Sequence, residues 1–233
     1  MRPDVRAVVF DLDDTLYPMR RYSHSAFTAV ATHLHRRCGL RPGRSLEILM
    51  GSLDADGGPG HEIDRLIDLC GLPSSWLPEL VMVSRNHEPA LRLSRGIRRV
   101  LLALRDSWQI GILTNGIPEV QARKIRALGL GPLVDAVVFA TEHGSGVGKP
   151  EAAPFVEISR RLGVDPARTV FVGDDEARDV AGASAVGMRT IRVTTWSGSR
   201  AAVATEADAV ARSLVRIPEL ADGLVGKAAV HAA

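Results

Sequence analysis

Short apolar runs alternate with amphipathic stretches from Gly96 onward, and this alternation constrains the fold more than any other feature. The spacing of apolar residues predicts strands and helices in turn. The predicted strands are 5–10, 109–113, 136–140, 169–172, 188–193 and a weak one at 209–210, and the predicted helices are 97–104, 118–128, 152–162, 177–185 and 218–225. Because strands that alternate with helices pair in parallel and are covered on both faces, we expect an α/β fold built on a Rossmann-like parallel sheet.

One long helical stretch interrupts this alternation directly after the first strand. Residues 19–93 have helical spacing of apolar positions, broken by a Gly/Asp/Pro cluster at 54–60 that predicts a loop. We therefore expect an inserted helical domain, 18–93. The core domain would consist of 1–17 and 94–225, followed by a flexible tail, 226–233.

Polar residues follow the predicted strands at the points where the strands end. These residues are Asp11 and Asp13, Thr114 with Asn115 and Gly116, Lys149, and Asp174 with Asp175 and Asp179. Parallel sheets bind ligands at the carboxyl ends of their strands, so the four loops are expected to meet. Carboxylates beside a buried strand are costly unless a cation or a reaction requires them. The pattern therefore indicates a functional site at one edge of the sheet.

These motifs carry a resemblance to a known family. The matching signatures, in order, are Asp11-x-Asp13-x-Thr15, the strand-terminal Thr114, Lys149 in Gly148-Lys149-Pro150, and Gly173-Asp174-x4-Asp179. Together they resemble the haloacid dehalogenase superfamily, in the phosphatase branch with an inserted helical cap of the C1 type. The resemblance implies a phosphatase that uses Mg²⁺ and forms an aspartyl-phosphate.

The resemblance also implies a role for each motif residue. Asp11 would be the nucleophile and Asp13 the general acid and base. Mg²⁺ would be held by the Asp11 carboxylate, the backbone carbonyl of Asp13 and Asp174. The phosphoryl group would contact Thr114, Lys149 and the backbone N–H groups of Asn115 and Gly116. Supporting roles fall to Thr15 in the first loop, to Asp179 beside Lys149 or a metal-bound water, and to Asp175, which could instead contact the metal.

Several of these residues also fit purely structural roles. Thr114-Asn115-Gly116 is also an ordinary turn sequence, and Asp174 and Asp179 could cap a helix. The stretch before Lys149 superficially resembles a nucleotide-binding loop, but His143 and Pro150 break that pattern. The histidines lack the spacing of zinc ligands. The predicted cap contains aromatic residues, which favour core packing, although two residues near its start could face substrate. The histidines of the predicted cap are His24, His33, His35, His61 and His87. The aromatic residues in the predicted cap or directly before it are Tyr17, Tyr22, Phe27 and Trp76, and the two residues near its start are Tyr22 and His24.

Several activities are possible on such a scaffold. Related dehalogenases need neither a second aspartate nor magnesium, so Asp13 argues against that activity. Related phosphonate hydrolases use a cap lysine, and the first lysine of this chain is Lys124. A sugar phosphomutase or a non-catalytic binding protein of this fold remains an alternative. The expected substrate is a small phosphate monoester, such as a sugar phosphate, a nucleoside monophosphate or a biosynthetic intermediate.

Composition narrows the class of protein further. The formal charge is +2, aromatic residues make up 4% of the chain, and no basic run exceeds two residues, so nucleic-acid binding is not expected. The apolar runs are too short to span a membrane, and a strand begins almost at the first residue, so we expect a cytoplasmic protein. Cys38 and Cys70 are expected as free thiols, and the protein as a monomer or homodimer. Only three of the 29 basic residues are lysines, which makes Lys149 in its loop notable.

Overall fold

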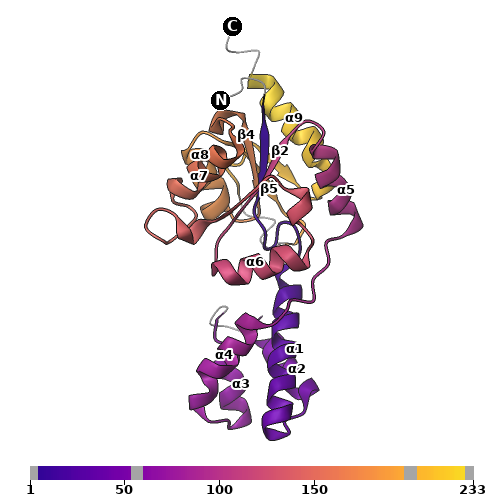
Figure 1. Cartoon of the computed structure of the whole chain (residues 1–233), viewed down its shortest axis with the longest axis vertical. Helices are drawn as coiled ribbons and strands as arrows, with labels where there is room; N and C mark the ends of the chain where they lie inside the picture. The colour runs from indigo at the N-terminus through magenta and orange to yellow at the C-terminus, as the bar shows by residue number, and fades with distance from the viewer. Residues whose placement is uncertain (1–4, 54–59, 197–203, 229–233) are drawn as a thin grey trace. The chain divides into compact units, whose positions relative to one another are not determined.

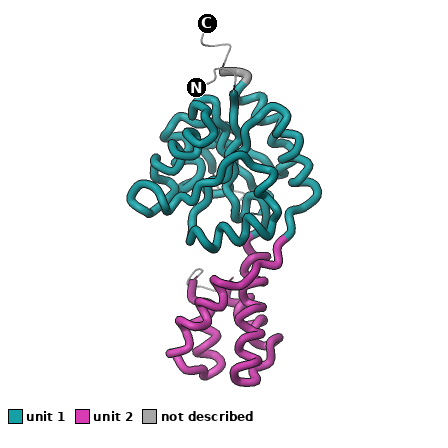
Figure 2. The backbone as a smooth tube through the Cα atoms, viewed as in Figure 1, with its two compact units in different colours: residues 1–18, 92–233 teal, residues 19–91 magenta. Residues whose placement is uncertain are grey.

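The computed structural model describes residues 5–53, 60–196 and 204–228. The chain forms two compact units, shown in Figure 2: the core unit, Met1–Pro18 with Arg92–Ala233, and the helical unit, Met19–Leu91. The predicted inserted domain, 18–93, differs from the helical unit by one residue at its start and two at its end.

The core unit is built on one parallel sheet. Its strands are β1 (Ala7–Phe10), β2 (Gln109–Thr114), β3 (Ala136–Phe139), β4 (Thr169–Gly173), β5 (Arg189–Val193) and β6 (Ala209–Ala211). They lie in the order β3-β2-β1-β4-β5-β6, and every neighbouring pair is parallel. The predicted α/β fold with a parallel sheet is therefore confirmed.

Helices cover both faces of this sheet (Figure 1). The core helices are α5 (Arg95–Leu104), α6 (Pro118–Ala127), α7 (Ala152–Leu162), α8 (Ala181–Ala185) and α9 (Ile217–Ala228). α7 and α8 pack together on one face, and α5 and α9 pack together on the other. Their ends are set by local sequence: Ser94 accepts a hydrogen bond from the N–H of Ile97 at the start of α5, and Gly163 adopts the left-handed conformation that ends α7.

The core is densest between the sheet and α7. Phe155 and Ile158 of α7 are fully buried against Val9 of β1 and Phe171 of β4. The rings of Phe155 and Phe171 lie 5.2 Å apart in an edge-to-face arrangement. Burial of each such side chain contributes about 1.5–3 kcal/mol to the free energy of folding. This packing holds in place the strands from which the polar loops extend.

The helical unit has a small core of its own. Its helices are α1 (Met19–Cys38), α2 (Pro42–Ser52), α3 (Glu62–Cys70) and α4 (Leu77–Asn86). Leu34, Leu49, Leu66 and Leu80, one from each helix, are fully buried. Tyr22 and Phe27 are also buried, as the core interpretation predicted, whereas His24 is exposed. Both cysteines are free thiols, which confirms the prediction for them.

Three predicted elements differ from the structure or lie outside it. The predicted helix 177–185 is divided into a π-helical turn, η5 (Glu176–Val180), and the short α8. The final helix runs to Ala228, three residues past its predicted end, and the rest of the predicted tail lies outside the described residues. The same holds for 54–59 of the predicted loop. Short 3₁₀ turns, absent from the prediction, are η1 (Ser74–Trp76), η2 (Gly131–Leu133), η3 (Ala140–Glu142), η4 (Pro166–Arg168) and η7 (Leu214–Arg216).

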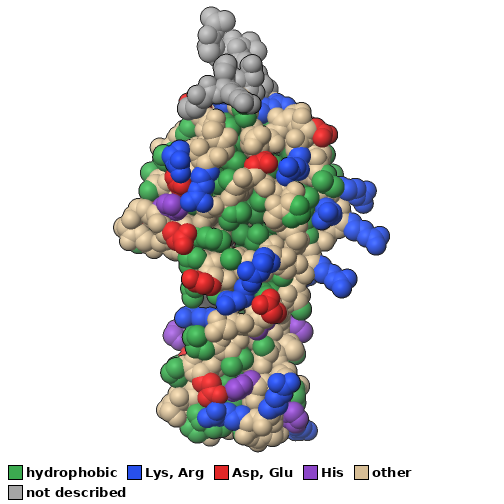
Figure 3. Space-filling view, in the orientation of Figure 1, with side chains coloured by type: hydrophobic (Ala, Val, Ile, Leu, Met, Phe, Trp, Pro, Cys, Tyr) green, Lys and Arg blue, Asp and Glu red, His purple; other side chains and the backbone are tan. Residues whose placement is uncertain are grey.

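Figure 3 shows both acidic and basic side chains on the face of the core unit that it draws, with several basic ones along the right edge. Within the described ranges, no helix combines the length and the apolar character that a membrane span requires.

Candidate active site

The ends of three neighbouring strands bring the predicted site residues together. β1 lies between β2 and β4, and Phe10 pairs with Ile112 on one side and with Val172 on the other. The N–H of Asp11 continues this ladder by donating to the carbonyl of Val172 at 2.9 Å. The loops after β1, β2 and β4 therefore leave the sheet at the same edge, as parallel pairing requires.

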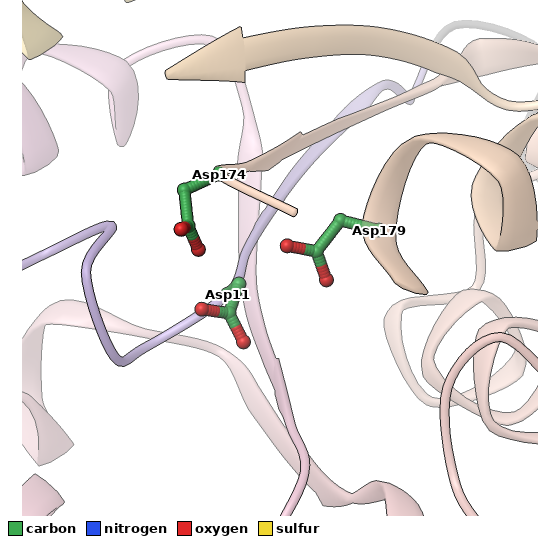
Figure 4. A group of neighbouring side chains, drawn as sticks. All are labelled: Asp11, Asp174 and Asp179. Atoms are coloured by element: carbon green, nitrogen blue, oxygen red, sulfur yellow. The ribbon is translucent and has the colours of Figure 1, made fainter. Parts of the chain in front are cut away.

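Three carboxylates converge at this edge. Asp11 follows β1, Asp174 follows β4, and Asp179 lies in η5. One oxygen from each lies within 4.8 Å of the others, and Figure 4 shows the three side chains pointing toward one another. Asp11 and Asp179 are buried, and Asp174 is partly buried. Like charges this close repel one another unless a cation lies among them.

Lys149 supplies one such cation. Its Nζ donates to Asp11 Oδ1 at 2.5 Å and to Asp179 Oδ1 at 2.6 Å, and its side chain is 3% exposed. The Asn115 side chain holds the Lys149 backbone from both sides, because Oδ1 accepts from the Lys149 N–H at 2.8 Å and Nδ2 donates to the Lys149 carbonyl at 3.1 Å. Gly148 makes this approach possible: its φ is +85°, and a Cβ there would lie 2.7 Å from Asn115 Oδ1. The side chain of Asn115 thus positions the lysine, a role the sequence analysis did not assign to it.

Burial controls the ionisation of these groups. It raises the pKa of Asp11 to about 7, with Lys149 opposing the shift and Asp179 adding to it. Burial also raises the pKa of Asp174 to about 7, with further contributions from Asp179, Asp14 and Asp175. Burial alone would lower the pKa of Lys149, but Asp11 and Asp179 outweigh it and raise that pKa. The lysine therefore stays charged, while the acidic cluster holds more negative charge than one lysine balances.

The donor set fits a hard divalent cation. Asp179 already accepts from Lys149 and, through Oδ2, from the N–H of Asp175 at 3.1 Å. Asp174, by contrast, has no side-chain hydrogen bond among the described residues, although it is partly buried beside two other carboxylates. An all-oxygen cluster with one carboxylate left unpaired is the chemistry that Mg²⁺ prefers. The structure places Asp179 both in this cluster and within hydrogen-bond distance of Lys149. Its expected role beside Lys149 or a metal-bound water stays a prediction.

Asp13 lies apart from the acidic cluster and is held by a different set of side chains. The backbone turns sharply after it, because Asp14 has a φ of 56°. Lys124 Nζ donates to both carboxylate oxygens of Asp13, at 2.9 and 2.8 Å, and Gln121 Nε2 donates to Oδ2 at 3.0 Å. The hydroxyl of Tyr17 donates to Oδ1.

Sequence reasoning missed all three partners of Asp13. Tyr17 was interpreted as a core residue, and it is buried, but its hydroxyl reaches the site. From the sequence, Lys124 stands out only as the first lysine of the chain, and Gln121 only as one residue of the predicted helix 118–128. The scarcity of lysine was the signal that could have found Lys124, because it marked Lys149 in the same way.

The remaining predicted residues have structural partners of their own. Thr114 ends β2, is buried, and its hydroxyl accepts from Gln121 Nε2 at 2.6 Å. The carbonyl of Gly116 accepts from the Thr141 hydroxyl at 2.9 Å. Asp175 caps η5 by accepting from the N–H of Arg178 at 2.8 Å, and it forms an ion pair with the Arg178 guanidinium at 2.7 Å, which directs its carboxylate into that pair.

Thr15 contributes to the first loop through its backbone. Its carbonyl accepts from the indole N–H of Trp196 at 3.3 Å. Its buried hydroxyl has no partner among the described residues. The expected steadying role of the Thr15 side chain therefore stays a prediction.

Comparison of the sequence with known proteins identifies a family. A model of the haloacid dehalogenase-like hydrolases matches residues 5–187. A curated glyceraldehyde 3-phosphate phosphatase of Methanopyrus kandleri is 32% identical over 200 residues, which cover 81% of this chain and 84% of the relative. A protein of the same name from Methanothermobacter thermautotrophicus is 30% identical and covers 81% and 85% of the two chains.

Solved structures give the same result for the fold. A HAD phosphatase from Thermococcus onnurineus has a TM-score of 0.60 at 25% identity, and the match covers 93% of this chain and 97% of that one. A 2-haloacid dehalogenase from Pseudomonas syringae has a TM-score of 0.63 at 26% identity, with the same coverage. The family match spans more than half of the sequence and confirms the resemblance drawn from the motifs. The chain therefore belongs to the haloacid dehalogenase-like hydrolases.

Proposed function

We propose that this hydrolase is a magnesium-dependent phosphatase that acts on a small sugar phosphate through an aspartyl-phosphate. The observation that carries the proposal is the arrangement of Asp11, Lys149 and Asp174 at the end of the central strand. A buried carboxylate that would be the nucleophile, a buried cation and a carboxylate without a side-chain hydrogen bond among the described residues meet there. Phosphate monoesters hydrolyse so slowly without catalysis that an enzyme needs this density of charge around the phosphoryl group.

Asp11 would attack phosphorus. Its Oδ1 is engaged by Lys149, which leaves Oδ2 for the attack, and the bond from phosphorus to the ester oxygen would break. Lys149 and Thr114 would bind phosphoryl oxygens as negative charge is redistributed among them. Mg²⁺, when bound by Asp11, Asp174 and the backbone carbonyl of Asp13, would neutralise charge between the nucleophile and the phosphate.

Asp13 would act as the general acid in the first step and as the general base in the second. In the first step it would give a proton to the leaving oxygen, so that the product departs as an alcohol. In the second it would accept a proton from the water that attacks phosphorus, and the bond from phosphorus to Asp11 would break to release inorganic phosphate. Asp13 can serve both steps because it lies only two residues beyond the nucleophile, in the loop that turns directly after it at Asp14.

The relatives support a sugar phosphate as the substrate. The curated proteins that match over four-fifths of this chain are named glyceraldehyde 3-phosphate phosphatases. We infer that this chain takes a triose phosphate or another small sugar phosphate. The helical unit, Met19–Leu91, would serve as the cap domain that selects among such substrates.

Two other activities are separated from this one by their products. A sugar phosphomutase would isomerise a hexose 1-phosphate and release little free phosphate. A dehalogenase, the activity named for one solved relative, would release halide from a 2-haloacid. The pairing of Asp13 with Lys124 and the unpaired Asp174 favour the phosphatase, because a dehalogenase of this family needs neither a second aspartate nor a metal.

A panel of phosphate monoesters tests the proposal. The protein, supplied with Mg²⁺, is expected to release phosphate from glyceraldehyde 3-phosphate or a similar small sugar phosphate. Asp11→Asn should abolish turnover and keep the far-UV circular dichroism of the wild type. Asp106→Asn, at an exposed aspartate in the turn before β2, is the matched control and should leave turnover unchanged. Retained activity in Asp11→Asn would remove this residue as the nucleophile, and absence of phosphate release across the panel would refute the function.

A further inference from the structure

We propose that Gln121 and Lys124, two buried residues on one face of α6, position the Asp13 carboxylate and the Thr114 hydroxyl for phosphoryl transfer. The inference rests on the proposed function and adds two positioning residues to it. Neither residue would touch the reacting atoms. Each would act through a side chain that does.

The burial of both side chains calls for an explanation. Gln121 and Lys124 are each 2% exposed, although they lie on a helix whose other basic residue in the last turn, Arg126, is exposed. Residues three apart on a helix share one face, so α6 presents the two together. An amide and an ammonium group are rarely buried unless their hydrogen bonds are satisfied, and here Asp13 satisfies both.

Lys124 fixes the plane of the Asp13 carboxylate. Its Nζ lies 2.9 Å from Oδ1 and 2.8 Å from Oδ2, so it bridges the two oxygens. The hydroxyl of Tyr17 and the amide of Gln121 each add one donor, on Oδ1 and Oδ2 respectively. Each oxygen therefore accepts two hydrogen bonds, which fixes the orientation of the side chain. Asp13 donates its proton to the leaving oxygen only where one of these donors has released its carboxyl oxygen. Fixed geometry of this kind is worth orders of magnitude in a proton transfer.

Gln121 links Asp13 to the phosphate-binding strand. Its Nε2 donates one hydrogen to Asp13 Oδ2 at 3.0 Å and the other to Thr114 Oγ1 at 2.6 Å. The reverse orientation of the amide would place its oxygen against the carboxylate. Because the Thr114 oxygen accepts from Gln121, its own proton is directed elsewhere, and the acceptor within reach is the Asn115 carbonyl at a long 3.4 Å. A phosphoryl oxygen would take that proton.

Lys124 and Lys149 neutralise different carboxylates of the site. Lys149 is paired with Asp11 and Asp179, and Lys124 is paired with Asp13. The nucleophile and the acid are only two residues apart, yet each has a cation of its own. The separate cations keep the two carboxylates in distinct positions, as two distinct roles require.

Esters with different leaving groups test this inference. Proton donation by Asp13 matters for an alkoxide that leaves poorly and matters little for p-nitrophenolate, which leaves without help. Lys124→Met is therefore expected to lower kcat for glyceraldehyde 3-phosphate by about 10²-fold and kcat for p-nitrophenyl phosphate by less than about 10-fold. Gln121→Leu should show the same selectivity together with a higher KM for both esters, because Thr114 loses its orientation. The Mg²⁺ concentration at half-maximal activity should not change in either variant.

Two further variants make the result decisive. Arg126→Met changes an exposed basic residue of the same helix and should leave both esters unaffected. Lys124→Arg keeps a cation that can bridge two oxygens and should recover part of the selectivity. Circular dichroism and thermal melting establish that each variant is folded. Gln121→Leu removes a neutral hydrogen-bond donor and leaves the ion pair between Lys124 and Asp13 intact. It therefore provides the test if Lys124→Met does not fold.

Each outcome bears on the inference. An equal loss of kcat for the two esters would show that α6 has only a structural role and would overturn it, as would unchanged kinetics in both variants. A wild type that hydrolyses neither ester would refute the proposed function itself and this inference with it. Selective loss for the alkyl ester supports both.

Discussion

Removal of the Lys149 charge should expose how much of the stability of this fold depends on a cation in the site. Lys149→Met keeps the length and apolar stem of the side chain but deletes its Nζ. The side chains of Lys149, Asp11 and Asp179 are 3%, 9% and 2% exposed, so water cannot replace the lost partner. Breaking a buried ion pair from one side costs about 3–5 kcal/mol. For a chain of this size that corresponds to a fall in Tm of about 6–20 °C.

The assay is thermal unfolding by circular dichroism at neutral pH, first in EDTA and then in excess Mg²⁺. We expect the full loss in EDTA and a partial recovery in Mg²⁺, because a bound cation stabilises the folded state and offsets the missing positive charge. Arg160→Met is the control: Arg160 pairs with Glu157 on the surface of α7, and its removal should change stability by less than about 0.5 kcal/mol. If Lys149→Met melts in EDTA together with the wild type, the two carboxylates do not depend on Lys149, and the reasoning is wrong.

Three further predictions concern the acidic cluster. Because the pKa values of Asp11 and Asp174 are raised to about 7, both carboxyls gain protons as the pH falls below 7, and Mg²⁺ affinity measured by calorimetry should fall by up to about tenfold per pH unit for each proton displaced. The same raised pKa values make the metal-free protein less stable as the pH rises. Between about pH 4 and 7 the two carboxyls are protonated in the folded state and ionised in the unfolded state, so unfolding releases protons and the Tm in EDTA should fall over this window. A Tm that rises over this window would contradict the assigned shifts. Gly173→Ala should lower turnover and reduce stability by about 1–3 kcal/mol, since its Cβ would lie 2.5 Å from the carboxyl carbon of Asp179; wild-type kinetics would show that this carboxylate can move without consequence.

The part of the site that sequence could predict is the part that strand geometry determines. Asp11 and Asp174 each follow a strand of one parallel sheet and Thr114 ends another, so the end of the strand fixes where each residue lies. Lys149 lies in the long loop after β3, so the strand predicts the edge of the sheet where the lysine lies but not its partners. The structure shows why it arrives at Asp11: the Asn115 side chain holds its backbone.

Gln121, Lys124 and Asp179, which sequence could not place exactly, lie on helical segments. Whether Gln121 and Lys124 face solvent or the site depends on how α6 is rotated against the sheet, and tertiary packing decides that. Asp179 was expected to lie on a regular helix, but the backbone there forms a π turn, in which the carbonyl of Asp175 accepts from the N–H of Asp179 and also from that of Val180. Periodicity alone does not distinguish such a turn from an α-helix.

The scarcity of lysine gives this protein a built-in set of reporters. Two of its three lysines, Lys124 and Lys149, are buried against carboxylates, and the third, Lys227, lies near the end of α9. Isotope labelling of lysine alone would thus yield a magnetic resonance spectrum in which two of three side-chain signals come from the proposed active site. Amine-directed coupling to a sensor surface would spare that site, because both of its ammonium groups are shielded from the reagent.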